Sequence, residues 1–301
     1  MTLPASLPEL IDVDVVRGVR TEAGAAPDLV IEIPHGATHT ADFERIRVQL
    51  TSPLPAGLVD FFHVNTDAGA PELGLAIAQH IVEADPTRTV AILRCRLPRT
   101  FIDCNRRIDA SPAEFKAGKV TPGLMPWITT PEDRALLRAE YDRYVLATRQ
   151  AMDALAPHGA ILLLHTYAPR SVDVEVDADI VTNLHRAYEP AVEGTWPLRP
   201  EIDVIATDTA GVSHAPAAVL AALKAEMSGA RFEVADGATY PLHPSTLAWD
   251  HVQRKPGHAL CLEIRRDLVA DPFDPFVQMT ISPSKVARLA APLATALRAW
   301  W

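Results

Sequence analysis

Three short, mostly apolar runs of the sequence each lead into a side chain that can bind a metal ion or transfer a proton. Imidazole nitrogens and carboxylate oxygens are common ligands of zinc, and both groups serve as general acids and bases. For any single run, an ordinary core strand with a polar end is the simpler interpretation. Together, the three runs favour neighbouring strands whose ends meet at one site. The runs and the groups after them are Leu29–Pro34 with His35, Ile161–Leu164 with His165, and Ala259–Leu262 with Glu263.

A zinc site is the first chemistry that these groups allow. A catalytic zinc usually has three protein ligands and keeps one position open for water. His35 and His165 are the natural nitrogen ligands, and Asp67, which ends the stretch Asp60–Asp67, is the best-placed carboxylate. Structural roles compete, because a lone histidine is more often a hydrogen-bonding group and Asp67 could lie at a helix N-terminus. The alternative ligands are His39, His63, His214 and His243.

Glu263 is the candidate for a general base. A metal would lower the pKa of its bound water towards about 7 and polarise a carbonyl group. A nearby carboxylate would then take the proton of the water and pass it to the leaving nitrogen. Glu263 follows an apolar run, so we expect partial desolvation, which raises the pKa of a carboxyl group. The alternative is a simple salt bridge with Arg265 or Arg266.

A cluster of arginines provides candidates for anion binding. Five arginines fall within the fourteen residues 94–107 of a chain that is acidic overall. A solvated basic face is the competing interpretation, but Phe101 and Ile102 interrupt the polar residues and indicate a packed segment. The planar guanidinium group of a packed arginine matches a carboxylate with two hydrogen bonds. We expect Asp103 to hold one arginine and leave others free for a substrate carboxylate.

The elements that must position these groups alternate between strands and helices. Apolar runs predict strands at 29–33, 89–93, 161–164, 202–206 and 231–235, with a further strand ending at Glu263. Helical periodicity indicates long helices at 132–155 and 284–301, whereas the Pro- and Gly-rich residues 111–131 are typical of a long surface loop. This alternation predicts an α/β fold with helices on both faces of a mostly parallel sheet, where ligands bind outside the carboxyl ends of the strands. We expect one domain over residues 1–301, since no repeat or linker interrupts the chain.

The composition excludes several classes of function. The net charge of −10 argues against binding nucleic acid through a basic surface. Three cysteines without C-x-x-C spacing do not suggest a disulfide framework. The first residues show no basic region followed by an apolar core, so we expect no signal peptide, and no apolar run approaches the roughly 20 residues of a membrane span. We therefore expect a cytoplasmic protein, without a nucleic-acid or membrane partner, that acts on a small molecule carrying a carboxylate.

Five sequence motifs occur in the order typical of the N-formylglutamate amidohydrolase family, which the chain resembles from about residue 29 to about residue 269. Any single motif is weak, whereas the combination is specific. The motifs are Ile33-Pro-His35-Gly, Asp60–Asp67, Arg99-Thr-Phe-Ile-Asp103-Cys-Asn105-Arg106, Leu164-His165-Thr and Leu260-Cys-Leu-Glu263-Ile-Arg265.

The resemblance implies a fold and a metal site. The family is similar in fold to the zinc carboxypeptidases, which implies a three-layer α/β/α arrangement around a mixed, mostly parallel sheet with Zn²⁺ at the strand ends. His35 and His165 match its metal-binding histidines, Asp67 matches its acidic position, and Glu263 matches the general base. Thr38 stands where zinc carboxypeptidases have a glutamate ligand, which leaves the third ligand open between Asp67 and another residue.

The resemblance also implies a site for a substrate carboxylate. The pair Asn105-Arg106 resembles the Asn-Arg pair with which zinc carboxypeptidases grip a terminal carboxylate, and Arg99 matches an arginine of the family shortly before it. After His165, Thr166 replaces the usual serine of the family, and Arg170 follows as a further substrate-binding candidate.

The expected function is zinc-dependent hydrolysis of a linear amide. The substrate would be an acidic amino acid, such as N-formylglutamate, that loses its N-formyl group or a similar small acyl group. Two alternatives remain open: a metallocarboxypeptidase that acts on small peptides, and a non-catalytic binding protein for acidic metabolites. The sequence leaves open the acyl group and the oligomeric state.

Overall fold

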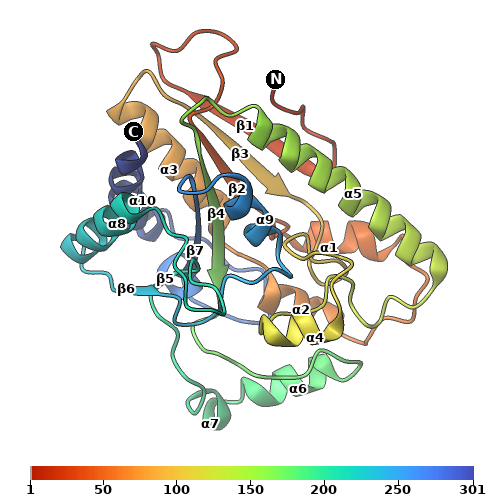
Figure 1. Cartoon of the computed structure of the whole chain (residues 1–301). Helices are drawn as coiled ribbons and strands as arrows, with labels where there is room; N and C mark the ends of the chain where they lie inside the picture. Colours follow the sequence, from red (N-terminus) through yellow and green to blue (C-terminus); the bar gives the residue numbers. More distant parts are fainter. Residues whose placement is uncertain (1) are drawn as a thin grey trace.

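Seven strands form one mixed sheet in the computed structural model, which describes residues 2–301 (Figure 1). The strand order is β1-β3-β2-β4-β7-β5-β6. β1 is antiparallel to β3 and β5 is antiparallel to β7, whereas the other pairings are parallel. The predicted α/β fold with a mostly parallel sheet is therefore confirmed. The strands are β1 (Ile11–Arg17), β2 (Leu29–Ile33), β3 (Thr89–Cys95), β4 (Ala160–Tyr167), β5 (Ile202–Val204), β6 (Val234–Asp236) and β7 (Ala259–Arg265).

The three apolar runs of the sequence are neighbouring parallel strands at the centre of this sheet. β4 lies between β2 and β7, and all of its residues are buried. A strand covered on both faces by helices needs apolar side chains on both, which explains its continuous apolar run. The prediction that the ends of these three strands meet is confirmed.

Helices cover both faces of the sheet (Figure 1). On one face, α3, α8 and α10 bury one apolar cluster, and on the other face α1, α2, α5, α6 and α9 bury a second cluster. None of the helices between residues 2 and 301 combines the length and the apolar character that a membrane crossing requires. The helices are α1 (Thr40–Arg47), α2 (Leu58–Asn65), α3 (Ala70–Ala84), α4 (Pro112–Ala117), α5 (Pro131–Asp153), α6 (Ile180–Ala187), α7 (Pro190–Glu193), α8 (Ala217–Gly229), α9 (Leu247–Arg254) and α10 (Pro283–Leu297).

Local sequence signals account for where the longest helix begins. Thr130 caps α5, because its hydroxyl accepts a hydrogen bond from the backbone N–H of Asp133. Pro131 occupies the first turn, where no helical hydrogen bond needs its missing N–H. The acidic side chains of the same turn interact favourably with the positive end of the helix dipole.

The structure also corrects the expected elements in the short segments. Residues 111–131 contain α4, whose start is a capping box formed by Ser111 and Glu114. Most of the stretch Asp60–Asp67 belongs to α2, and α1 and α9 were not expected. These helices are short, so tertiary packing rather than local propensity stabilises them.

Candidate active site

The candidate residues gather at the carboxyl ends of the central strands. His35 follows β2 directly after Pro34, which ends the strand. In the parallel pairing of β4 with β7, His165 and Glu263 are register partners. Side chains of register partners leave a sheet on the same face, so these two groups lie side by side.

Two histidines and an aspartate form a buried group that could hold a metal ion. His35 Nδ1 lies 3.2 Å from Asp67 Oδ2, and His165 Nδ1 lies 2.9 Å from the same oxygen. The candidate ligand atoms lie within 4.8 Å of one another, and each residue is at most 3% exposed. Two imidazole nitrogens and one carboxylate oxygen are a donor set found in catalytic zinc sites, so the residues fit the ion.

Asp67 is held at this position by backbone contacts and by its charge. Its N–H donates to the carbonyl of His35 at 3.3 Å, and Thr66 Oγ1 donates to the carbonyl of Ala37 at 2.6 Å. Burial alone would raise the pKa of Asp67, but His35 and His165 outweigh this effect and lower it. The carboxylate therefore stays ionised, as a metal ligand must be.

The other histidines considered as ligands lie outside this group. His39 precedes α1 at its N-cap, and His63 lies within α2. His214 Nε2 contacts Asp208 at 3.0 Å, and His243 Nδ1 contacts the hydroxyl of Ser245 at 2.8 Å. Among the candidates, the geometry therefore favours Asp67 as the third ligand.

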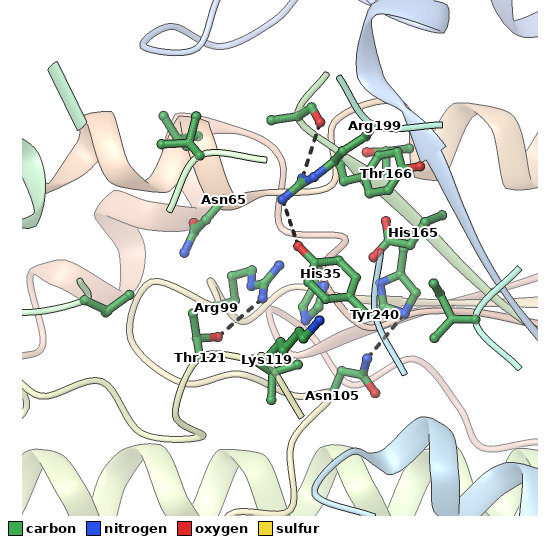
Figure 2. Close-up of a pocket in the computed structure, with 18 of the residues that line it drawn as sticks. His35, Asn65, Arg99, Asn105, Lys119, Thr121, His165, Thr166, Arg199 and Tyr240 are labelled. Atoms are coloured by element: carbon green, nitrogen blue, oxygen red, sulfur yellow. Dashed lines mark hydrogen bonds between the residues drawn. The ribbon is translucent and has the colours of Figure 1, made fainter. Parts of the chain in front are cut away.

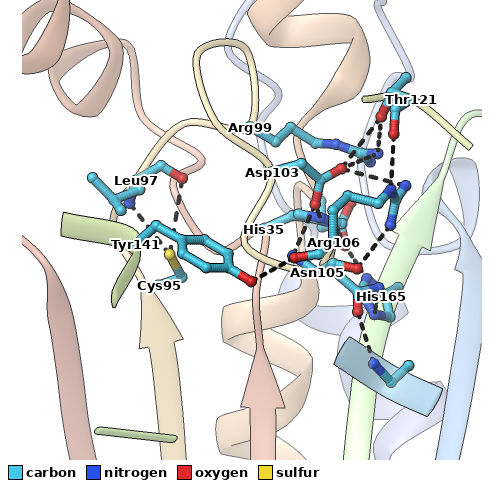
Figure 3. A network of polar contacts seen from close by, with 12 residues as sticks. His35, Cys95, Leu97, Arg99, Asp103, Asn105, Arg106, Thr121, Tyr141 and His165 are labelled. Atoms are coloured by element: carbon cyan, nitrogen blue, oxygen red, sulfur yellow. Dashed lines mark hydrogen bonds and ion pairs between the residues drawn. The ribbon is translucent and has the colours of Figure 1, made fainter. Parts of the chain in front are cut away.

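Asp103 links His35 to two arginines (Figure 3). Its Oδ1 lies 2.8 Å from His35 Nε2, while its Oδ2 lies 3.0 Å from Arg99 Nη2 and 3.3 Å from Arg106 Nη2. Burial would raise the pKa of Asp103, but Arg106, His35 and Arg99 hold it well below its usual range. An ionised Asp103 accepts a hydrogen bond from Nε2 of His35. This leaves Nδ1 of His35 facing Asp67.

This contact between Asp103 and His35 corrects the sequence analysis, which expected Asp103 to hold one arginine. Asp103 pairs with two arginines and orients a candidate ligand as well. The sequence shows the charges but not the approach of the β3 loop to His35, because that contact depends on the pairing of β2 with β3.

The Asn105-Arg106 pair is largely engaged by the protein itself. Arg106 is 4% exposed, and its Nε donates to the carbonyl of Thr121 at 3.1 Å. Asn105 Oδ1 accepts from the N–H of Ala248 at 3.1 Å, while its Nδ2 lies 3.4 Å from His165 Nε2. Asn105 therefore contacts a candidate ligand in addition to lining the cavity.

Glu263 has an enclosed oxygen without a hydrogen-bond partner. The side chain is half-buried, and Oε2 is fully covered yet unpaired within the described chain. Burial, with a contribution from Asp67, raises the pKa of Glu263 to about 7 against the opposing effect of His165. A carboxylate with this pKa can both accept and release a proton near neutral pH.

One cavity of about 230 Å³ joins the two parts of the site (Figure 2). Both histidines and Glu263 line it, together with all four predicted substrate-binding residues. Arg170 Nη1 also donates to the carbonyl of Trp196 at 2.6 Å. The predicted substrate-binding residues that line the cavity are Arg99, Asn105, Arg106 and Arg170.

Sequence reasoning missed several polar residues of this cavity. Arg199, Tyr240, Tyr188 and Arg266 line it but come from separate segments without a shared motif. The Arg265-Arg266 pair was visible only as a possible salt-bridge partner of Glu263. Instead, Arg265 Nε pairs with Asp267 Oδ1 at 2.8 Å, and Arg266 contacts backbone carbonyls.

The fold and the site define an α/β protein with a candidate metal centre at the carboxyl ends of its central strands. A sequence model of the N-formylglutamate amidohydrolase family matches residues 27–270. The match spans most of the chain, which therefore belongs to this family, and the predicted resemblance is confirmed. Membership supports a hydrolase that acts on an amide bond.

A solved structure agrees with the fold. An N-formylglutamate amidohydrolase from Ralstonia eutropha JMP134 superposes with a TM-score of 0.59 at 17% identity, over 95% of this chain and 96% of that chain. A gene product of Agrobacterium tumefaciens superposes with a TM-score of 0.49 at 18% identity, over 96% of this chain and 94% of that chain. A search among curated proteins found no matching relative.

Proposed function

We propose that this protein is a zinc-dependent amidohydrolase that removes an N-formyl group, or a similarly small acyl group, from an acidic amino acid such as N-formylglutamate. The main observation behind this proposal is that one cavity joins the buried His35-Asp67-His165 group to the unpaired Oε2 of Glu263. Family membership supports the class of reaction, and the arginines of the cavity support a substrate with a carboxylate.

In this proposal His35, Asp67 and His165 hold the metal. The ion, when bound, supplies Lewis acidity that activates water and polarises the amide carbonyl. Asp103 keeps the His35 ring oriented by accepting from its Nε2, as carboxylates do behind many metal-binding histidines.

Glu263 moves the proton in the proposed reaction. Its Oε2 accepts a proton from the attacking water as the carbon–oxygen bond forms at the formyl carbon. It then delivers this proton to the amide nitrogen as the carbon–nitrogen bond breaks. The products are formate and the free amino acid, and Glu263 returns to its carboxylate form. A pKa of about 7 suits both transfers.

In this proposal the substrate carboxylate is bound by Arg99, Asn105, Arg106 and Arg170. Arg99 and Arg106 share the single negative charge of Asp103, so the three side chains together keep a net positive charge. Arg99 Nε is enclosed without a partner within the described chain. These positively charged groups can therefore orient a substrate carboxylate beside the candidate metal centre.

The first experiment measures metal content and turnover together. Protein purified without a metal-affinity tag is analysed for metals beside a His165→Ala variant, and both are assayed with N-formyl-L-glutamate and with dipeptides. We expect about one zinc per chain in the wild type, loss of zinc in the variant, and turnover of the formyl substrate only. A wild type that binds no zinc after zinc is supplied would overturn the metal mechanism, and dipeptide turnover alone would favour a carboxypeptidase.

A further inference from the structure

Arg266 is a buried cation without an acidic partner. It is 3% exposed, yet its Nε and Nη1 donate to the backbone carbonyls of Thr166 and Val64. No carboxylate in residues 2–301 lies within ion-pair distance of it. Burial lowers the pKa of Arg266 to about 10. A buried charge is costly unless it is paired, so this guanidinium group lacks an anion that its surroundings call for.

Arg199 lies in the same cavity, also without a carboxylate partner in the described chain. Its Nη2 donates to Tyr240 Oη at 2.8 Å, and its Nε donates to Ser171 Oγ at 3.1 Å. Figure 2 shows the guanidinium group directed towards Tyr240. The carbonyl of Ala168 accepts from Nη1 at 3.3 Å, so both arginines are anchored to the segment that follows His165.

Tyr188 adds a third donor to this part of the cavity. Its Oη is fully enclosed and has no hydrogen-bond partner within residues 2–301. Burial raises the pKa of Tyr188, whereas the charges of Arg266 and Arg199 lower it, which indicates that both guanidinium groups are close to the ring. Two cations without an ion-pair partner and an unpaired hydroxyl therefore line one cavity, in which Glu263 is the one carboxylate among the described lining residues.

The charge balance of the cavity supports the same conclusion. Among the described residues that line the cavity, Glu263 is the only carboxylate, whereas five arginines and one lysine line it. Asp103, behind the wall, offsets Arg99 and Arg106 but reaches neither Arg199 nor Arg266. A substrate with one carboxylate would leave part of this positive charge unmatched.

We propose that Arg199, Arg266 and Tyr188 form a second anion subsite, which takes the side-chain carboxylate of a dicarboxylate substrate. This assignment rests on the proposed function and deepens it, because these residues would determine specificity while Arg99, Asn105 and Arg106 bind the other carboxylate. They reach the substrate rather than the reacting bond, so their loss should remove selectivity and leave the chemistry in place.

An apolar wall borders the second anion subsite. Val172, Val174 and Val176 alternate with acidic residues in a segment that is neither helix nor strand, and all three valines line the cavity. The apolar wall suits the methylene groups of the substrate side chain. It also keeps water away, so that the pairing of a carboxylate with the arginines is stronger than it would be in open solvent.

The test compares N-formyl-L-glutamate with N-formyl-L-glutamine, which has nearly the same shape without the side-chain charge. We expect the wild type to prefer the glutamate substrate in kcat/KM by roughly 100-fold or more. Arg199→Met should remove most of this preference by slowing the glutamate substrate, with the glutamine substrate changed by less than about threefold. Tyr188→Phe should lower only the glutamate value, by about five- to tenfold.

Arg186→Met is the matched control, because Arg186 is an exposed residue of α6 that does not line the cavity. It should leave both substrates unchanged. Replacement of Arg266 risks unfolding the buried segment, so Arg199 and Tyr188 carry the test. Equal losses for both substrates in Arg199→Met would overturn the subsite, since a structural role does not distinguish the two side chains.

Calorimetry separates failure of the subsite from failure of the proposed hydrolysis. Glutarate and butyrate are titrated into the wild type and into Arg199→Met. We expect glutarate to bind the wild type roughly tenfold or more tightly than butyrate, and this difference should disappear in the variant. That result without turnover of any formyl substrate would retain the subsite and reject the hydrolase. Equal binding of both acids to the wild type would reject the subsite.

Discussion

Glu263 combines two features that are unusual for one carboxyl group: an enclosed oxygen without a partner, and a position directly beside His165 in the paired strands. An enclosed carboxylate oxygen without a partner destabilises a fold, so its position at the end of a central strand supports the proposed role of Glu263. The alternative from the sequence, a salt bridge to Arg265 or Arg266, does not occur within the described chain.

Replacing Glu263 with glutamine should remove most of the activity and keep the metal. The amide has nearly the same shape but cannot take a proton, so we expect kcat to fall by about 100- to 10,000-fold. Steady-state kinetics and elemental analysis on the same preparation check this. Wild-type turnover in Glu263→Gln would show that another group accepts the proton.

Asp103 should act as a positioning residue for His35. Asp103→Asn keeps the shape but loses the charge that accepts from Nε2, so we expect zinc affinity to fall by about 10- to 100-fold. Competition with a chelator measures the affinity, and Asp142→Asn, at an exposed ion pair of α5, is the control. Unchanged zinc affinity in Asp103→Asn would argue that Asp103 serves the arginines alone.

At the scale of elements, the turn before α3 holds Asp67 in the site. Gly69 has φ of +88° and is followed by the first residue of the helix. A Cβ at this position would lie 2.4 Å from Val269 Cγ2. Neither the backbone conformation nor the space therefore tolerates a larger residue.

Gly69→Ala should destabilise the protein and weaken zinc binding together. Backbone strain of about 1–2 kcal/mol adds to an overpacking cost of about 1–3 kcal/mol. Gly24→Ala is the matched control, because Gly24 has φ of +82° but no atom within 4 Å of an added Cβ. Urea denaturation and zinc titration of both variants check this, and equal losses of stability would contradict the clash with Val269.

The start of α5 supplies a pH-dependent contribution to stability. Asp133 is 2% exposed and accepts hydrogen bonds from the N–H groups of Ser52 at 2.6 Å and Thr51 at 3.0 Å. Burial raises the pKa of Asp133, but these hydrogen bonds outweigh burial and lower it from 3.8 to about 2. The stabilisation is therefore present above about pH 4 and is lost as the pH falls through about 2.

Asp133→Asn should accordingly lower Tm at pH 7, and the difference from the wild type should shrink as the pH falls towards 2.5. Thermal unfolding at several pH values, with Asp142→Asn as an exposed control on the same helix, measures this difference. A difference in Tm that does not depend on pH would mean that the charge of Asp133 does not provide the stabilisation.

At the scale of the whole molecule, two apolar clusters share one sheet. β2 contributes Val30 to one cluster and Ile31 to the other, so the loss of either cluster exposes the same strand. The site depends on both faces as well, because Asp67, which contacts His165, lies between α2 and α3, and these two helices cover opposite faces of the sheet. We therefore propose that residues 1–301 form a single domain.

A single domain predicts one cooperative unfolding transition. Trp127 lies in one apolar cluster and Trp300 packs against the other, so tryptophan fluorescence reports on both. We expect fluorescence and circular dichroism to follow the same curve in urea. Zinc at 100 times its Kd should stabilise the fold by about 2.7 kcal/mol, and His165→Ala should lose this gain. Two separated transitions would indicate two folding units.

Much of this organisation could be predicted from the sequence, because it depends on local patterns. Continuous apolar runs predict central parallel strands, and helical periodicity predicts α5 and α10 within a few residues. The candidate metal group was also predictable, because His35 and His165 stand at the ends of such runs. Short helices such as α1 and α2 were not, since their stability comes from packing.

By itself, the sequence determined the fold class and the residues able to do chemistry, because strand and helix patterns and side-chain types are local properties. Only the tertiary structure decided which of these groups meet. The approach of Asp103 to His35, the unpaired Oε2 of Glu263 and the gathering of Arg199, Arg266 and Tyr188 all join distant segments. Such contacts depend on strand order and helix packing, which side-chain spacing along the chain does not specify.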